Sequence, residues 1–174
     1  MSSEVLLTKE PLVTMEVFYF QRLTRLAEKY GFVDGGAYEL TTGWDASQSG
    51  DVERLLRDID EKDPYVVSCF PPCGYMSPLQ ALTSEEKRRD PARFESELKK
   101  EISFIVLCLE IARRQVRRGK HFIFEQSRGR ATWDLNEMID FLLEFEPCVA
   151  EAAGSASTND TLSPGSPSGR YGAS

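Results

Sequence analysis

The sequence is poor in the residues that bind metals or build disulfide scaffolds. It contains one histidine, His121, and four cysteines among 174 residues. A zinc site needs three or four Cys and His ligands at close spacing, so no metal centre is expected. Four cysteines are also too few to staple a chain of this length, and we interpret them as thiols.

Long hydrophobic runs are absent as well. No apolar run approaches the roughly 18 residues that span a bilayer, and the first residues lack the basic and apolar segments of a secretory signal. These absences predict a soluble intracellular protein, nuclear or cytoplasmic, without a membrane partner. At roughly 100 to 200 residues per domain the length allows one domain. The 41% hydrophobic content is enough for a modest core.

Basic residues are in the minority, with 21 Lys and Arg against 28 Asp and Glu and a net charge of −7. This balance disfavours indiscriminate binding to phosphates. The exception is the stretch 87–130, where 13 basic residues face 6 acidic ones. Its densest part is the run Arg113, Arg114, Arg117, Arg118 and Lys120. That run is either a solvated helix end that complements the helix dipole or a contact for nucleic acid.

The hydrophobic periodicity predicts strands that alternate with helices. We predict strands at 12–18, 37–40, 65–70 and 121–124, and helices at 21–30, 50–62, 91–118 and 133–145. The pair Gly35-Gly36 is predicted to form a turn. Strands joined by helices indicate βα units, so the expected fold class is α/β, a Rossmann-like three-layer sandwich with a mainly parallel sheet.

The same patterns divide the chain into an N-terminal arm at 1–11, an α/β domain at 12–147 and a Ser/Gly/Pro tail at 148–174. From Ala152 onward the tail has hardly a large apolar residue. It cannot bury enough surface to offset the entropy of ordering, and we predict that it is disordered.

Ligands of open parallel sheets bind at the carboxyl ends of the strands. In the predicted layout these ends carry residues 18–22, 39–45, 69–77 and 125–130. Pro71-Pro72 ends the third strand because proline cannot donate to a sheet ladder. We therefore expect Cys73 in a loop at this rim of the sheet.

The residues on these strand ends resemble a known family. Pro71-Pro72-Cys73-Gly74-Tyr75-Met76-Ser77 is similar to the Pro-Cys motif of cytosine-C5 DNA methyltransferases, which reads PCQxFS. The next predicted strand ends in Glu125, where that family has Glu-Asn-Val, and Gly43-Trp44-Asp45 is similar to its Gly-Asp-Ile segment. The resemblance covers roughly Val13 to Trp133.

The sequence is more similar still to methyltransferase-like segments found inside some retroelement polyproteins. Their pattern is a GWD turn, an acidic helix and a strand leading into PPCxxxSxLQ, followed later by FE(H/Q)(P/S). Residues 41–45 and 71–80 match this pattern. The order and spacing of these short motifs carry the resemblance, because each of them alone is unspecific.

The resemblance implies a methyltransferase-like domain, with an incomplete methyltransferase fold, that uses S-adenosylmethionine and acts on DNA or RNA. C5 of cytosine becomes nucleophilic only after a thiolate adds at C6. Cys73 would be that thiolate, and Glu125, kept protonated in a water-poor site, would donate to N3. The base would be single stranded or flipped out of a duplex, where Tyr75 could stack on it.

The resemblance also implies roles for other residues of the rim. The cofactor contacts would be Phe18, Glu39, Asp45 and Pro71, and the nucleic-acid contacts Ser77, Gln80, Arg128 and Arg130. Glu39 corresponds to the acid that binds the ribose of the cofactor. The two arginines would bind phosphates.

Two features depart from the family. Its FxGxG motif, whose glycines let the backbone approach the cofactor, is replaced by Phe18-Tyr19-Phe20-Gln21-Arg22. We predict that the large side chains of Tyr19 and Phe20 occupy the methionine pocket or force a different loop. The chain also enters its Ser/Gly/Pro tail where the family continues through further strands and a target-recognition region.

Simpler interpretations of the same residues stay open. Cys73 is alternatively a loop thiol after a strand-ending Pro-Pro, and Glu125 a capping or ion-pairing residue. Glu39 and Asp45 are alternatively acids that flank turns. The other cysteines, Cys69, Cys108 and Cys148, are interpreted as small apolar fillers.

Three hypotheses of function follow. The first is a cytosine-C5-type methyltransferase domain or a decayed relative of one. The second is a non-catalytic module that binds nucleic acid or other segments of a retroelement-derived polyprotein. The third is a fragment of a larger polyprotein with no activity of its own. An amino-methyltransferase is disfavoured, because Phe70 and Cys73 reverse the polar and aromatic positions of its (N/D/S)PP(Y/F) signature.

Overall fold

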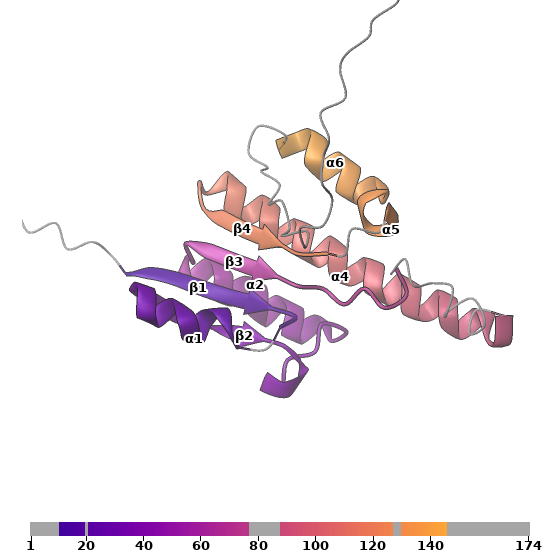
Figure 1. The fold of residues 1–174 in the computed structure, drawn as a ribbon, viewed down its shortest axis with the longest axis horizontal. Coiled ribbons are helices and arrows are strands. Elements are labelled where there is room, and N and C mark those ends of the chain that lie inside the picture. The colour runs from indigo at the N-terminus through magenta and orange to yellow at the C-terminus, as the bar shows by residue number, and fades with distance from the viewer. Residues whose placement is uncertain (1–10, 20, 77–87, 127–129, 146–174) are drawn as a thin grey trace, which may run out of the picture.

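A four-stranded, all-parallel sheet forms the centre of the protein (Figure 1). The computed structural model describes residues 11–19, 21–76, 88–126 and 130–145, with Arg130 described by its backbone alone. The strands are β1 (Leu12–Val17), β2 (Phe32–Tyr38), β3 (Val66–Cys69) and β4 (His121–Phe124), in the spatial order β2-β1-β3-β4. This arrangement confirms the predicted α/β, Rossmann-like fold class.

Helices connect the strands as the periodicity predicted. They are α1 (Leu23–Ala27), α2 (Ser49–Lys62), α4 (Pro91–Arg117), α5 (Arg130–Trp133) and α6 (Asn136–Phe145), with the short 3-10 helices η1 (Glu28–Tyr30) and η2 (Leu40–Thr42). The predicted helix at 133–145 is therefore α6 with a separate short helix before it. Residues 1–10 of the predicted arm, and the whole predicted tail, lie outside the described residues.

The second strand differs from its prediction, because β2 begins five residues earlier than the predicted strand at 37–40 and contains both glycines of the predicted turn. A Cβ atom on Gly35 would lie 2.6 Å from the side chain of Met15, so only glycine lets the two strands approach this closely. Gly36 has a φ of 109° and lies where the register of β1 against β2 shifts. The prediction of a turn was wrong because the glycines here form a β-bulge.

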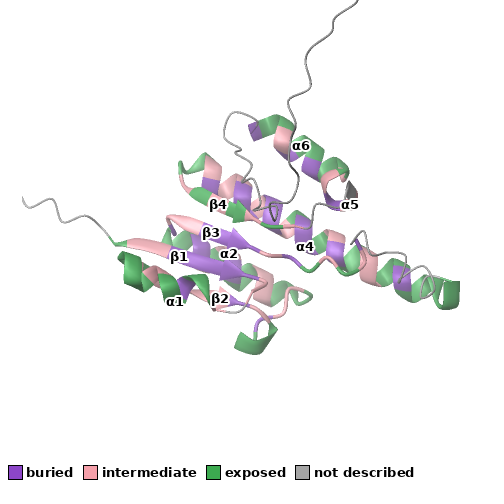
Figure 2. Ribbon diagram, in the orientation of Figure 1, coloured by how far each residue is buried: buried purple, intermediate pink, exposed green. Residues whose placement is uncertain are grey.

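One face of the sheet is covered by α2 and α4. The core on this face contains Met15 and Val17 of β1, Val67 and Cys69 of β3, Leu55 and Ile59 of α2, and Cys108 and Ile111 of α4. The side chains come from alternate positions of β1 and β3, as the pleat of a strand requires. Figure 2 shows the buried residues concentrated on these two central strands.

A second core cluster lies between α4, α6 and β4. Its buried members are Met76, Ile105, Leu109, Ala112, Met138, Phe141 and Phe145. Phe122 and Phe124 of β4 pack against it. On the opposite face of the sheet α1 contacts β1 and β2, whereas Ile123 of β4 is 49% exposed. Among the described residues the two faces are therefore covered unequally.

Helix α4 is much longer than the strands that it covers. Its 27 residues extend about 40 Å at 1.5 Å per residue. Asp90 caps its start by accepting a hydrogen bond from the backbone N–H of Arg93 at 3.0 Å. The first half of α4 projects beyond the carboxyl ends of the strands (Figure 1). No helix in the described ranges is both long and apolar enough to cross a membrane.

Candidate functional site

The loops that follow the four strands lie along the carboxyl edge of the sheet, as predicted. Sheets of this kind bind ligands in the crevice outside that edge, where successive connections leave a strand in opposite directions. Here the connections diverge at β1, because β2 lies on one side of it and β3 on the other. The described rim consists of the segments after β1, β2, β3 and β4 (Figure 1).

The loop after β3 carries Cys73 and is anchored at both ends. At its start Pro71 is buried, and its carbonyl oxygen accepts a hydrogen bond from Nε2 of Gln126 at 2.6 Å. At its end Met76 is buried in the cluster between α4 and α6. Cys73 lies between these anchors and is half-buried. We call residues 71–76 the Cys73 loop.

A residue that the sequence analysis did not select contacts the middle of this loop. The carboxylate of Glu101 on α4 accepts the backbone N–H of Tyr75, at 2.9 and 3.1 Å to its two oxygens. Glu101 is only 7% exposed. Burial raises the pKa of its carboxyl, while the backbone N–H groups of the loop act in the opposite direction. The sequence carried a signal, because Glu101 interrupts the apolar stripe of α4 three residues after Leu98.

Glu125 follows β4, the neighbour of β3. Its backbone N–H donates to the carbonyl of Cys69 at 3.1 Å, which extends the parallel ladder by one residue. Glu125 and the Cys73 loop therefore lie at the ends of adjacent strands, as the resemblance implies. The Glu125 side chain is exposed. The described residues do not supply the water-poor surroundings that the predicted proton donor needs.

Tyr75, the residue predicted to stack on a base, contacts α4. Its ring lies edge-on to that of Phe94, with the centroids 5.4 Å apart. This contact joins the Cys73 loop to the projecting half of α4.

The segment after β1 fills the crevice with aromatic side chains. Phe18 has a φ of 65°, which is rare for a residue other than glycine, and its ring packs on Trp44 and Phe104 at centroid distances of 5.3 and 5.1 Å. The next ring, that of Tyr19, lies 4.7 Å from the ring of Phe70, which follows β3. Tyr19 and Phe70 therefore bridge the ends of β1 and β3, where the crevice lies.

The start of α1 binds a carboxylate of the protein itself. Helix N-termini bind phosphates in many nucleotide-binding folds, because their first N–H groups have no partner within the helix. Here Glu16 of β1, fully buried, accepts the N–H of Leu23 at 3.1 Å and the N–H and hydroxyl of Thr24 at 2.9 and 2.8 Å. These donors are consequently unavailable to a ligand.

Glu39 lines an open hollow between the segments after β1 and β2. The hollow has a volume of about 310 Å³ and is lined by Gln21, Arg22, Arg25, Glu39, Thr41 and Thr42. Thr41 donates a hydroxyl hydrogen bond to the Glu39 carboxylate, and the backbone N–H of Glu39 donates to Oγ1 of Thr42. Among the predicted cofactor contacts, Glu39 is the one that lines this hollow.

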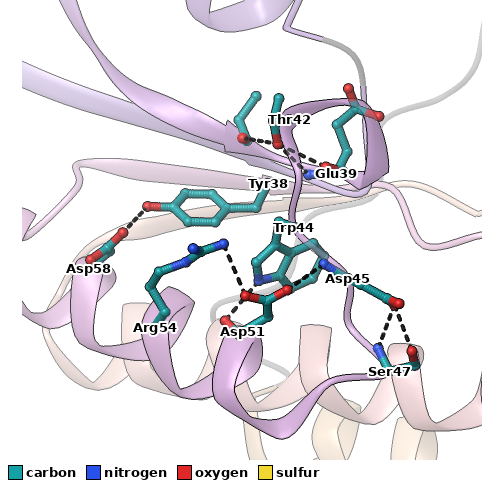
Figure 3. Close-up of polar contacts among 10 residues, drawn as sticks. Tyr38, Glu39, Thr42, Trp44, Asp45, Ser47, Asp51, Arg54 and Asp58 are labelled. Atoms are coloured by element: carbon teal, nitrogen blue, oxygen red, sulfur yellow. Dashed lines mark hydrogen bonds and ion pairs between the residues drawn. The ribbon is translucent and has the colours of Figure 1, made fainter.

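Asp45 points away from Glu39 and stabilises the turn before α2 (Figure 3). Its Oδ1 accepts the N–H of Ser47 at 2.9 Å and the Ser47 hydroxyl at 2.8 Å, and these bonds hold the pKa of the Asp45 carboxyl below its ordinary value. The neighbouring Trp44 is buried, and its Nε1–H donates to the carbonyl of Asp51 at 2.8 Å. The Gly-Trp-Asp segment thus anchors the chain to α2.

Tyr38, the last residue of β2, completes this anchor. Its hydroxyl donates to Oδ2 of Asp58 on α2 at 2.5 Å (Figure 3), and burial together with this bond raises the pKa of the phenol. The ring of Tyr38 lies edge-on to Trp44, with the centroids 6.1 Å apart. These contacts are structural and fix the position of η2 and Glu39.

Taken together, the contacts of the described rim put aromatic side chains where the resembled family has glycines beside its cofactor. A cofactor that bound at the crevice would meet the paired rings of Tyr19 and Phe70. Asp45, predicted to contact it, is bound to Ser47. Glu39 lies at the edge of the open hollow.

The basic run on α4 is paired with acidic residues of the protein. Arg113 and Arg117 bind Glu144 of α6 at 3.0 and 2.8 Å, Arg114 and Arg118 bind Asp60 of α2, and Lys120 binds Asp63 at 2.8 Å. The hydrogen bond that Arg114 donates to the Glu110 carboxylate is the main cause that raises the pKa of Arg114. The run therefore joins α2 and α6 to α4.

The predicted nucleic-acid contacts are not placed by the structure. Ser77, Gln80 and Arg128 lie outside the described residues, and only the backbone of Arg130 is described, at the start of α5. Cys69 and Cys108 are buried, as expected of small core residues, and Cys148 lies outside the described ranges. Within those ranges no three His, Cys, Asp or Glu side chains gather as metal ligands would.

The fold and rim define a Rossmann-like α/β protein with an anchored Cys73 loop at the carboxyl edge of its sheet. Comparison with family models, curated proteins and solved structures finds no match for the chain.

Proposed function

We propose that this chain is a methyltransferase-like domain of the cytosine-C5 type that keeps the half of the site that reacts with the base, while the cofactor half is closed. The observation that carries the proposal is that Cys73 and Glu125 follow adjacent parallel strands, with the Cys73 loop fixed between Gln126 and Glu101. A reactive thiol has to be held in place to attack a base productively.

The proposed step is reversible addition to cytosine. The Cys73 thiolate forms a bond to C6, Glu125 as a carboxylic acid gives its proton to N3, and the electron pair of the C5–C6 double bond makes C5 basic. C5 then takes a proton from water. Loss of the original C5 hydrogen as a proton, departure of the thiolate and return of the N3 proton to Glu125 restore cytosine.

The net result of this step is exchange of the C5 hydrogen with solvent, which needs no oxidant, reductant or methyl donor. Because Glu125 is exposed, the bound nucleic acid must itself exclude water from the carboxyl group to keep it protonated. A base inside a duplex cannot reach a loop thiol, so the favoured substrate is single-stranded DNA or RNA.

The test is a hydrogen-exchange assay with the full chain and single-stranded oligonucleotides that carry tritium at C5 of cytosine. We expect release of tritium into water without any cofactor. Cys73→Ser should abolish the release, and Glu125→Gln should slow it by about 100-fold or more, as loss of a general acid does. Cys148→Ser, which removes a thiol far along the sequence, is the matched control and should release tritium at the wild-type rate.

Two results would contradict the proposal. One is a folded wild-type chain that releases no tritium above the chemical background. The other is a Cys73→Ser variant that releases tritium as fast as the wild type. If the folded chain binds the oligonucleotide without exchange, the non-catalytic binding module becomes the better description.

A further inference from the structure

Glu101 is an acid in an apolar position. It lies on the stripe of α4 that faces the core, between Leu98 and Ile105, and is 7% exposed. Burying a carboxylate is costly unless hydrogen bonds replace its water. A buried acid at this position therefore needs hydrogen-bond donors close to it.

What Glu101 binds is the backbone of the Cys73 loop. Both carboxylate oxygens accept the N–H of Tyr75, two residues after the cysteine. The N–H groups of Gly74 and Met76 also stabilise the charged carboxylate. A Cβ atom on Gly74 would lie 3.4 Å from Oε1 of Glu101, so the loop passes directly over the acid.

The contact completes a set of three anchors. Gln126 holds the carbonyl of Pro71 at the start of the loop, and Met76 is buried at its end. Glu101 holds the segment between them, and it is a charged acceptor, which forms stronger hydrogen bonds than a neutral one. Without Glu101, the backbone N–H of Tyr75 would lose its hydrogen bond to α4.

We infer that Glu101 is a positioning residue that fixes the Cys73 thiol by binding the backbone N–H groups that follow it. Its role in a reaction rests on the proposed function, but its effect on the thiol can be measured without any substrate. Glu97, one turn earlier on α4, places another carboxyl group near Glu101.

The experiment measures how fast iodoacetamide alkylates Cys73 in the full chain, with peptide mapping to separate Cys73 from the other cysteines. The variants are Glu101→Gln, which keeps the shape, and Glu101→Ala, which removes the acceptor. Glu97→Gln is the matched control, because it removes a neighbouring charge without touching the loop N–H groups. Each rate is measured over a range of pH.

We expect alkylation of Cys73 to be faster by about threefold or more in Glu101→Gln and faster still in Glu101→Ala, since charge-assisted hydrogen bonds are lost. Glu97→Gln should give the wild-type rate. Hydrogen–deuterium exchange should show faster exchange at the N–H of Tyr75 while the N–H groups of α4 stay protected.

The inference is overturned if Glu101→Gln keeps the wild-type rate, or if Glu97→Gln changes the rate equally. Should Glu101→Ala fail to fold, Glu101→Gln decides alone. The proposed function can fail separately from this inference. If the wild-type protein shows no tritium exchange but the Glu101 variants change the alkylation rate as expected, Cys73 is a positioned thiol whose substrate is not cytosine.

Discussion

At the scale of single residues, aromatic rings decide whether the crevice is open. Tyr19 and Phe70 face each other across the ends of β1 and β3. Phe18 holds a left-handed backbone that costs about 1 to 3 kcal/mol in residues other than glycine. Its packing on Trp44 and Phe104 offsets this strain, and this local structure replaces the glycine-rich turn of the resembled family.

This arrangement predicts the outcome of calorimetric titration with S-adenosylmethionine and S-adenosylhomocysteine. The wild-type chain should give no binding heat at ligand concentrations up to about 1 mM, because the rings close the crevice. The double variant Tyr19→Ala/Phe70→Ala should gain measurable binding. Tyr30→Ala is the control, since Tyr30 is 79% exposed on η1 and its loss leaves the crevice closed.

Micromolar binding by the wild type, lost in Glu39→Ala, would contradict this prediction. It would mean that the loop after β1 opens in solution and that the hollow beside Glu39 receives the ribose. The cofactor half of the site would then be functional, and methyl transfer would have to be tested directly.

At the scale of elements, β2 illustrates how a partner strand determines local structure. Gly35 would read as a turn residue in isolation, but in the sheet it faces the side chains of Val13 and Met15, 2.7 and 2.6 Å from where its Cβ would be. The neighbouring bulge increases the local twist and so changes the direction of the end of β2. Glu39, which lines the hollow, is the next residue after that end of β2.

A pair of glycine substitutions tests this account. Gly35→Ala should lower the free energy of unfolding by about 1 to 3 kcal/mol, as overpacking does. Gly50→Ala, in α2 with open space around the new Cβ, should raise it by about 0.5 kcal/mol through helix propensity. Urea unfolding followed by tryptophan fluorescence measures both, and equal effects of the two substitutions would show that Gly35 is not constrained by β1.

At the scale of the whole molecule, ion pairs connect the helices of one face. The basic end of α4 is bound by Asp60 of α2 and Glu144 of α6. Each exposed ion pair stabilises the fold little by itself. The pairs nevertheless engage the arginine side chains that would otherwise bind the phosphates of a nucleic acid. Acidic side chains of α2 and α6 therefore neutralise part of the excess positive charge in residues 87–130.

We predict that this run does not bind nucleic acid. Arg114→Gln/Arg118→Gln should leave the affinity for a single-stranded oligonucleotide within about twofold of the wild type in fluorescence anisotropy. Arg128→Gln/Arg130→Gln should weaken binding and reduce its dependence on salt, as loss of phosphate contacts does. A large loss of affinity in the first variant alone would assign the nucleic-acid surface to the end of α4.

The sequence alone determined the order of strands and helices, the parallel sheet and the rim on which Cys73 and Glu125 lie. These features follow from hydrophobic periodicity and from proline and capping residues, which act over a few neighbouring positions. Only the tertiary structure decided that Gly35 lies inside a strand, that Tyr19 meets Phe70, and that Glu101 holds the Cys73 loop. Each of these contacts joins residues 20 or more positions apart, and a local pattern carries no information about which distant side chain will fill a given space.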